Sequence, residues 1–367
     1  MRFFVPTDLR IETDVVSASA EAIAALGKQC LILTGAASAK KSGALDDLRA
    51  VLDDMEITYH IYDRIPQNPT VDVCQEAGML GWQLRADFVV GIGGGSVLDA
   101  AKAAAVFAAN PALTEDALYA YEWKRTPLPT VCIGTTAGTG SEVTPVSVLT
   151  DQNGRKRSIR DDRLYPALSL GDARYLVSLP PEFTRSCAVD AAAHCIESYF
   201  NRNATPISRL FAAKGAAMLA KLLGRLDALS DSERAELYLA SIYGGYAISV
   251  TGTAFPHAMG YFLTEQYGVP HGTACAVFLP AFLRHNADAV PQETNAFALQ
   301  TGCSIQNWID LLDRATPPCS VTLTLAQIAA LRSRFVRNSG IARSLGTFTD
   351  ADAVRTLTEI FLKTRSV

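Results

Sequence analysis

The chain has 367 residues, of which 49% are hydrophobic and 19% charged, enough apolar material for roughly two domains with buried cores. Its 33 Lys and Arg and 37 Asp and Glu leave a formal net charge of −4, which gives no overall attraction to nucleic acid or to an anionic membrane. The eight cysteines form no Cys-x-x-Cys pair, so we expect reduced thiols in a cytoplasmic protein. We expect no signal peptide, because the chain reaches Asp8 before any long apolar stretch.

Short β-rich runs alternate with helical patterns through the first half of the chain. The runs predicted to be strands cover residues 29–34, 57–62, 86–92 and 130–133. A helical pattern over residues 44–55 separates the first two runs. This alternation predicts a parallel sheet with helices on both faces, in which ligands bind beyond the carboxyl ends of the strands.

The pattern changes after Pro180-Pro181, where long segments rich in alanine and leucine begin. Helical periodicity covers residues 184–200, 206–226 and 232–250. The stretch 237–264 has no charged residue, but glycines, hydroxyls and a proline interrupt it, and we interpret it as a buried helix and loop rather than a membrane span.

These patterns predict an α/β + all-α fold. We expect an N-terminal Rossmann-like parallel-sheet domain over residues 1–179 and a C-terminal all-helical domain over residues 180–367. Ligand sites of two-domain proteins often lie where the domains meet, so we expect the site in the cleft between them.

Two glycine-rich turns follow predicted strands. The first covers residues 91–99 (GIGGGSVLD) and opens an Ala-rich helix, and the second covers residues 134–142 (GTTAGTGSE). Glycine lets the backbone approach a ligand closely, and the N–H groups that open a helix suit a phosphate. The spacing is not Gly-x-Gly-x-x-Gly, and one such turn alone is also compatible with a connection that binds nothing. Two glycine-rich turns in one sheet favour a nucleotide as the ligand. Ser96 and Asp99, three residues apart at the start of the helix, also resemble a helix-capping pair.

Four polar residues have the chemistry of metal ligands. Asp190 and His194 are four residues apart in an apolar helical segment, and burying both without partners would be costly. His257 and His271 follow later in the chain. Each histidine alone is more often a core or surface residue than a ligand, and Asp190 with His194 alone is also compatible with a pair at a helix surface or in its first turn. Three imidazoles and one carboxylate together would form a four-ligand site for a divalent transition metal.

These motifs together resemble those of the iron-containing (group III) alcohol dehydrogenase family. The matching segments, in family order, are GGGSVLDAAKA (93–103), TTAGTGSEVT (135–144), KRSI (156–159), DAAAHCIESY (190–199) and HAMGYFLTEQYGVPHGTACAVFLP (257–280). The resemblance implies a dehydroquinate synthase-like architecture, in which a dinucleotide bound to the α/β domain meets a divalent metal bound to the helical domain.

The resemblance also implies roles for individual residues. The metal ligands would be Asp190, His194, His257 and His271. The residues that would contact the cofactor are Asn68, Gly93, Gly94, Gly95, Ser96, Asp99, Thr135, Thr136, Thr139, Ser141 and Lys156.

Two positions depart from the family pattern. Many relatives have a further histidine four residues after the third ligand, where this chain has Tyr261. That histidine is thought to relay the alcohol proton, and the Tyr261 hydroxyl, a water or the cofactor ribose could replace it. Tyr261 could instead line the substrate pocket, with Phe255 and the loop 134–150.

The second departure concerns the choice of cofactor. Relatives that prefer NAD often place an aspartate at the end of the first strand, whereas this chain has Gly35, followed by Ser38 and Lys40. Hydroxyl and ammonium donors without a carboxylate suit the 2′-phosphate of NADP(H), so we expect NADP(H) to be favoured over NAD(H). The lysine is also compatible with a solvated surface position.

We therefore expect an enzyme, a metal-dependent oxidoreductase that interconverts a primary alcohol and its aldehyde, with Fe²⁺ or Zn²⁺ polarising the substrate oxygen. We expect a homodimer or higher homo-oligomer with no nucleic-acid or membrane partner. The alternatives are glycerol dehydrogenase-type polyol oxidation, dehydroquinate synthase-type chemistry, and a nucleotide-binding protein without catalysis.

Overall fold

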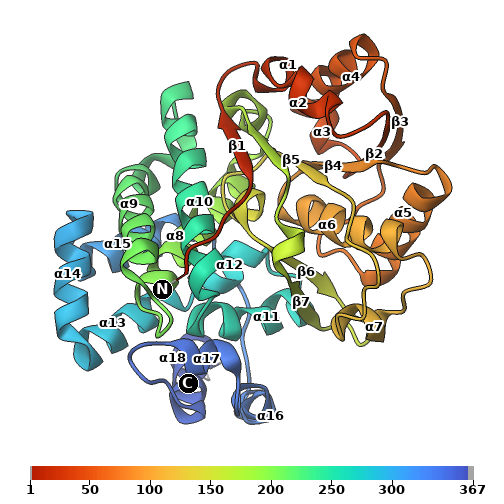
Figure 1. The fold of residues 1–367 in the computed structure, drawn as a ribbon. Coiled ribbons are helices and arrows are strands. Elements are labelled where there is room, and N and C mark those ends of the chain that lie inside the picture. Colours follow the sequence, from red (N-terminus) through yellow and green to blue (C-terminus); the bar gives the residue numbers. More distant parts are fainter. Residues whose placement is uncertain (1, 363–367) are drawn as a thin grey trace. The chain divides into compact units, whose positions relative to one another are not determined.

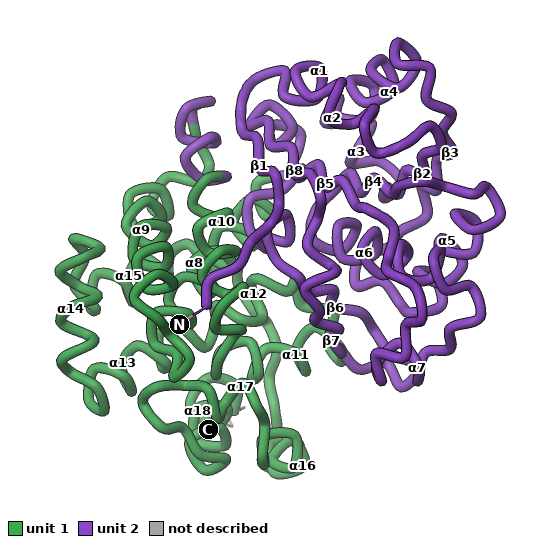
Figure 2. Tube along the Cα trace, in the orientation of Figure 1, with its two compact units in different colours: residues 1, 181–229, 239–367 green, residues 2–180, 230–238 purple. Residues whose placement is uncertain are grey.

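The computed structural model describes residues 2–362, which divide into two compact units. One unit comprises residues 2–180 and 230–238 and contains the main sheet, and the other comprises residues 181–229 and 239–362 and is built from helices (Figure 2). The short segment 230–238 belongs to the sheet-containing unit, although its sequence pattern resembles that of the helical half. The reason is Tyr238, which is fully buried there and donates a hydrogen bond to Glu142 (3.1 Å).

The first unit is organised around a six-stranded sheet whose order is β1-β8-β5-β4-β2-β3, with every neighbouring pair parallel (Figure 1). Its strands are β1 (Asp8–Ile11), β2 (Gln29–Thr34), β3 (Thr58–Tyr62), β4 (Phe88–Gly93), β5 (Thr130–Gly134) and β8 (Leu168–Gly171). From β2 the chain moves outward to β3, and from β4 it moves the other way to β5. The carboxyl ends of β2 and β4 therefore flank the point at which the strand order reverses, where open α/β sheets bind ligands.

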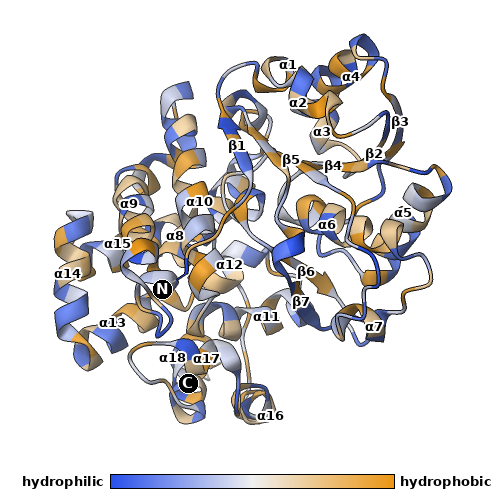
Figure 3. Cartoon of the chain, viewed as in Figure 1, coloured by the Kyte–Doolittle hydropathy of each residue, from blue (hydrophilic) through white to orange (hydrophobic). Residues whose placement is uncertain are grey.

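Helices cover both faces of this sheet. Successive residues of β2 enter different cores: Leu31 and Leu33 pack with α5 and α6, whereas Cys30 and Ile32 pack with α1 and α4. Figure 3 shows the central strands as mainly hydrophobic, as expected for a parallel sheet buried on both sides. The helices are α1 (Val15–Ala18), α2 (Ala20–Ala24), α3 (Ser38–Lys41), α4 (Ala44–Asp54), α5 (Val71–Gln83), α6 (Gly95–Ala109) and α7 (Glu115–Tyr119).

Three 3₁₀ turns and a hairpin complete this unit. The turns cover Ser141–Val143, Asp162–Leu164 and Ala173–Leu176. The hairpin consists of the antiparallel strands β6 (Val146–Thr150) and β7 (Lys156–Arg160). It packs against α6, so it lies near the helix that follows the first glycine turn.

The second unit contains α8 (Pro181–Tyr199), α9 (Pro206–Leu222), a 3₁₀ turn (Leu223–Ala228), most of α10 (Asp231–Thr251), α11 (Phe255–Tyr267), α12 (His271–Ala276), α13 (Leu279–Ala289), α14 (Pro291–Thr301), α15 (Ile305–Ala315), α16 (Leu325–Phe335), α17 (Ser339–Arg343) and α18 (Asp350–Phe361). Local sequence signals set several of their starts. For example, Thr205 and Ser208 form a capping box around Pro206 at the start of α9. Within residues 2–362, no helix has the length and hydropathy needed to cross a membrane.

One contact inside the helical unit matters for the site. Helices α8 and α12 pack so closely at Gly272 that a Cβ atom there would lie 1.9 Å from the backbone oxygen of Ser186. Only glycine leaves room for this approach. The contact brings the start of α12 against the middle of α8.

Candidate metal centre and nucleotide-binding turns

Three helices bring the four candidate metal ligands together. Helix α8 carries Asp190 and His194 one turn apart, α11 carries His257 in its first turn, and α12 begins at His271. The Nε2 atom of His257 lies 3.6 Å from Oδ1 of Asp190 and 3.1 Å from Nε2 of His194. The ring of His271 stands edge-on to that of His257, with centroids 5.2 Å apart. Residues separated by up to 81 positions in the chain thus form one cluster of nitrogen and oxygen donors.

The chemistry of this cluster fits a divalent metal. Asp190 is 3% exposed, and its Oδ1 atom has no hydrogen-bond partner among the described residues, an arrangement that is costly unless another group compensates it. Burial raises the pKa of Asp190, but the imidazoles of His194, His271 and His257 outweigh it, so that the pKa lies below its ordinary value and the group is a carboxylate. Ionised oxygen and imidazole nitrogen are common ligands of iron and zinc.

Glu197 orients one of these imidazoles and was missed by sequence reasoning. It is fully buried on α8, and its Oε1 atom lies 2.5 Å from Nδ1 of His257, while Oε2 accepts the backbone N–H of Ala254 (2.6 Å). A carboxylate at Nδ1 fixes the proton there and turns the Nε2 lone pair toward Asp190 and His194. The sequence feature that could have pointed to Glu197 is its position, seven residues after Asp190 in the same apolar helical segment.

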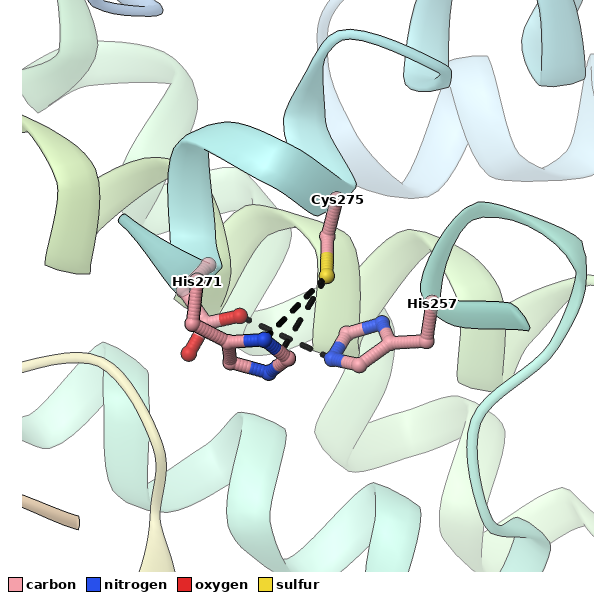
Figure 4. A group of neighbouring side chains, drawn as sticks. His257, His271 and Cys275 are labelled. Atoms are coloured by element: carbon pink, nitrogen blue, oxygen red, sulfur yellow. Dashed lines mark hydrogen bonds and ion pairs between the residues drawn. The ribbon is translucent and has the colours of Figure 1, made fainter. Parts of the chain in front are cut away.

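Cys275 is a second neighbour that sequence reasoning missed. It lies one turn after His271 on α12, and its sulfur is 3.8 Å from Nδ1 and 4.0 Å from Nε2 of that histidine (Figure 4). The available signal was the four-residue spacing from His271, which places both side chains on one helix face.

Tyr261 lies beside the cluster. Its ring stacks on that of His271 at 14° between planes, with centroids 5.9 Å apart. Burial is the main cause that raises the pKa of Tyr261, to about 12, so the side chain remains a neutral phenol at physiological pH. A phenol can donate a hydrogen bond and accept another.

The two glycine turns lie against each other in the sheet-containing unit. A Cβ atom on Gly95 would lie 2.5 Å from Cγ2 of Thr139, and one on Gly94 would lie 2.9 Å from Cγ2 of Thr136. The predicted Ser96–Asp99 capping pair is wrong: Gly94 is the N-cap of α6, and no side chain caps that helix. The Ser96 hydroxyl instead accepts the backbone N–H of Asn68 (3.2 Å) and so joins a third loop to the turn.

Asp99 and Lys102 organise the second turn from within α6. Asp99 accepts hydrogen bonds from the Ser141 hydroxyl (2.6 Å) and the backbone N–H of Val148 (2.9 Å). Lys102 is fully buried, and its ammonium donates to the backbone oxygens of Ser141 (2.6 Å) and Thr144 (2.9 Å). Both carboxylate oxygens of Asp99 thus accept hydrogen bonds from protein groups. Sequence reasoning missed Lys102, although it is the single charged residue in the alanine-rich run that follows Asp99.

The remaining predicted cofactor residues lie at the ends of β2 and β7 and in the loop before α5. The ammonium of Lys156 donates to Oδ1 of Asn68 (2.6 Å). Gly35 follows β2 and is close to the Ser38 hydroxyl, which lies 3.6 Å from the position of a Cβ atom on this glycine. Thr135 is buried at the start of the second turn. The ammonium of Lys40 lies 3.6 Å from a carboxylate oxygen of Asp63, and both side chains are about half exposed.

A doubly wound parallel sheet with paired glycine turns, together with a helical unit that holds a carboxylate–imidazole cluster, is the combination expected of a metal-dependent enzyme that uses a nucleotide. Comparison with known sequence families identifies the family. The sequence model "Iron-containing alcohol dehydrogenase" matches residues 6–173, and "Fe-containing alcohol dehydrogenase family, C-terminal" matches residues 184–314. The chain belongs to the iron-containing alcohol dehydrogenase family and is an oxidoreductase, which confirms the resemblance and the predicted fold class.

Individual relatives agree with this assignment. Alcohol dehydrogenase 4 of Schizosaccharomyces pombe is 32% identical over 78% of this chain and 68% of its own length. The crystal structure of an iron-containing alcohol dehydrogenase from Thermotoga maritima is 34% identical and superposes with a TM-score of 0.91 over 98% of this chain and 99% of that one. A sulfoacetaldehyde reductase from Bifidobacterium kashiwanohense, solved in complex with NAD+, is 27% identical, with a TM-score of 0.86 over 98% of both chains.

Proposed function

We propose that this oxidoreductase interconverts a primary alcohol and its aldehyde by hydride transfer to and from a nicotinamide dinucleotide. The observation that carries the proposal is the buried cluster of Asp190, His194 and His257, whose donor atoms lie 3.1–3.9 Å apart. Such a cluster has no need to exist in a protein that only binds nucleotides. The names of relatives that act on small aldehydes, such as the sulfoacetaldehyde reductase, support a small substrate.

The residues proposed to hold the ion are Asp190, His194, His257 and His271. Bound there, Fe²⁺ or Zn²⁺ would supply Lewis-acid polarisation of the substrate oxygen. Glu197 keeps the proton on Nδ1 of His257 and thereby fixes the direction of its Nε2 lone pair. The Tyr261 phenol, stacked on His271, is proposed to line the substrate pocket or to pass a proton through its hydroxyl.

The nucleotide is proposed to bind at the carboxyl ends of β2 and β4. The backbone N–H groups at the start of α6 would face its pyrophosphate, with Thr135, Thr136 and Thr139 beside them. Asp99 and Ser141 shape this loop through their mutual hydrogen bond. Lys156 and Asn68, hydrogen-bonded to each other, would lie on the ribose side.

Replacement of His271 by alanine tests the proposal. We expect loss of metal from anaerobically prepared protein and loss of turnover with an alcohol and aldehyde panel, because the variant lacks one imidazole of the cluster. His60→Ala, which removes an exposed imidazole on β3, is the matched control and should keep both properties. Full metal occupancy and a normal rate in His271→Ala would show that His271 is no ligand.

We further propose that NADP(H) is preferred over NAD(H). Gly35 places no carboxylate where the ribose 2′ position is expected, and Ser38 and Lys40 offer donors nearby. Asp63 pairs with Lys40 at the surface and would have to release it to a 2′-phosphate.

Catalytic efficiency with the two cofactors tests this preference. We expect kcat/KM to be higher with NADPH than with NADH, and Lys40→Met to lower the NADPH value by about tenfold, because a hydrogen bond to a charged group contributes roughly 1.5–3 kcal/mol. The NADH value of the same variant serves as the internal control and should not change. An equal or higher efficiency with NADH in the unsubstituted protein would overturn the preference.

We also propose a cytoplasmic homodimer or higher homo-oligomer, with no nucleic-acid or membrane partner. All eight cysteines are free thiols, which supports a reducing compartment. The mild net charge of −4 offers no general attraction to polyanions.

A further inference from the structure

The Cys275 side chain brings a soft donor to the metal cluster. It is fully buried, and Figure 4 shows it on the same helix as His271, with its sulfur facing the space between His271 and His257. The ligand atoms of Cys275 and His257 also lie within 4.8 Å of each other. Cys275 is thus a buried cysteine with two imidazole neighbours.

Four donors that include this sulfur form a compact set. The ligand atoms of Asp190, His257, His271 and Cys275 all lie within 4.8 Å of one another. Two ligands on one tetrahedral zinc ion are separated by about 3.3–3.6 Å, given bonds of about 2.0–2.3 Å. The distance of 3.8 Å from the Cys275 sulfur to Nδ1 of His271 and that of 3.6 Å from Asp190 to His257 are close to this range.

An independent observation indicates that an ion is needed between Asp190, His257 and His271. Oδ1 of Asp190 is buried and accepts no hydrogen bond among the described residues, although it lies between imidazoles. Two donor sets therefore overlap at Asp190, His257 and His271. The ligand atoms of the set with Cys275 all lie within 4.8 Å of one another, whereas His194 lies 3.1 Å from His257 and 3.9 Å from Asp190. The fourth member is His194 in one set and Cys275 in the other.

We propose that Cys275 is a metal-binding residue of this chain and an alternative to His194 as the fourth ligand. The inference rests on the metal site of the proposed function. Coordination would form a sulfur–metal bond and release the thiol proton to solvent. With a divalent ion, the set containing His194 has a formal charge of +1 and the set containing Cys275 is neutral. Thiolate favours Zn²⁺ and Co²⁺ over Fe²⁺, so Cys275 would make the site selective among metals.

Cobalt substitution tests the proposal without relying on activity. Protein stripped of metal and loaded with Co²⁺ under anaerobic conditions should show a thiolate-to-cobalt charge-transfer band in the near ultraviolet. We expect Cys275→Ser to bind one cobalt per chain, which also shows that it is folded, and to lack the band. Cys187→Ser, which changes a partly buried cysteine of α8, is the matched control and should keep the band.

The outcomes separate this inference from the proposed function. Cobalt bound without the band, or a band that persists in Cys275→Ser, would overturn the role of Cys275 and leave the metal site intact. Failure of the unsubstituted protein to bind any divalent metal would overturn the metal site as well. As a second measurement, Cys275→Ser should weaken Zn²⁺ binding by about tenfold or more, because losing even an outer-shell partner costs about that much. The loss of Fe²⁺ binding should be smaller. Equal losses for both metals would contradict the proposed selectivity.

Discussion

Replacement of Lys102 by methionine is expected to lower the free energy of unfolding by about 3–5 kcal/mol, the usual result of removing one partner from a buried charged network. The ammonium donates to the Ser141 hydroxyl (2.7 Å) and to the backbone oxygens of Ser141, Thr144 and Val146 (2.6–3.0 Å). Methionine fills a similar volume but cannot donate a hydrogen bond to any of these oxygens. It also removes the cation that favours the charged form of Asp99, whose pKa burial raises.

Denaturant unfolding and nucleotide titration measure this effect. The second glycine turn should lose the hydrogen bonds that Lys102 donates to it. We therefore expect the variant to bind the dinucleotide more weakly and to be less stable. Lys41→Met, at an exposed position of α3, is the matched control and should change the stability by less than about 0.5 kcal/mol. Unchanged stability and nucleotide affinity in Lys102→Met would show that this network does not hold the turn.

Gly272→Ala is expected to destabilise the helical unit and to remove the metal. The new methyl group would lie 1.9 Å from the Ser186 backbone oxygen and 2.8 Å from Cβ of Asp190. Neither contact is with the end of a flexible side chain, so α12 must move away from α8 and carry His271 with it. Overpacking costs about 1–3 kcal/mol and occasionally more, and we expect this variant at or above the upper end.

Thermal unfolding together with metal analysis of the anaerobic protein tests this prediction. Gly224→Ala is the matched control, because a Cβ atom there would meet only Cδ2 of Leu311 at 3.9 Å. That control should keep its metal and its stability to within about 1 kcal/mol. A Gly272→Ala protein with normal metal content and melting temperature would mean that α12 can shift without disturbing the site.

Much of the fold is predictable where the hydrophobic pattern is continuous. The predicted strand 29–34 coincides with β2, because every central strand of a parallel sheet must be apolar on both faces. Strand β1 and the hairpin β6–β7 were missed, since their residues are only partly buried and their pairing is decided by distant segments. Strand β8 is fully buried but has only 4 residues, too few for a periodic signal.

In the candidate site, too, some residues could be predicted from the sequence and others could not. Asp190, His194 and the glycine turns have local spacings that point to their chemistry, so the sequence alone could single them out. Glu197, Lys102 and Cys275 gain their roles from contacts across the fold: Glu197 from α11, Lys102 from the turn after β5, and Cys275 from the approach of α12 to α8. Their residue types alone did not distinguish them from ordinary buried residues.

All the candidate metal donors belong to the helical unit, and both glycine turns belong to the sheet-containing unit. Chelation of the ion therefore removes nothing from the surface on which the dinucleotide is proposed to rest. If both proposed sites exist, metal-free protein would keep the residues proposed to bind the dinucleotide and would lack the ion proposed to polarise the substrate. The metal content and the bound dinucleotide of one preparation could then vary separately.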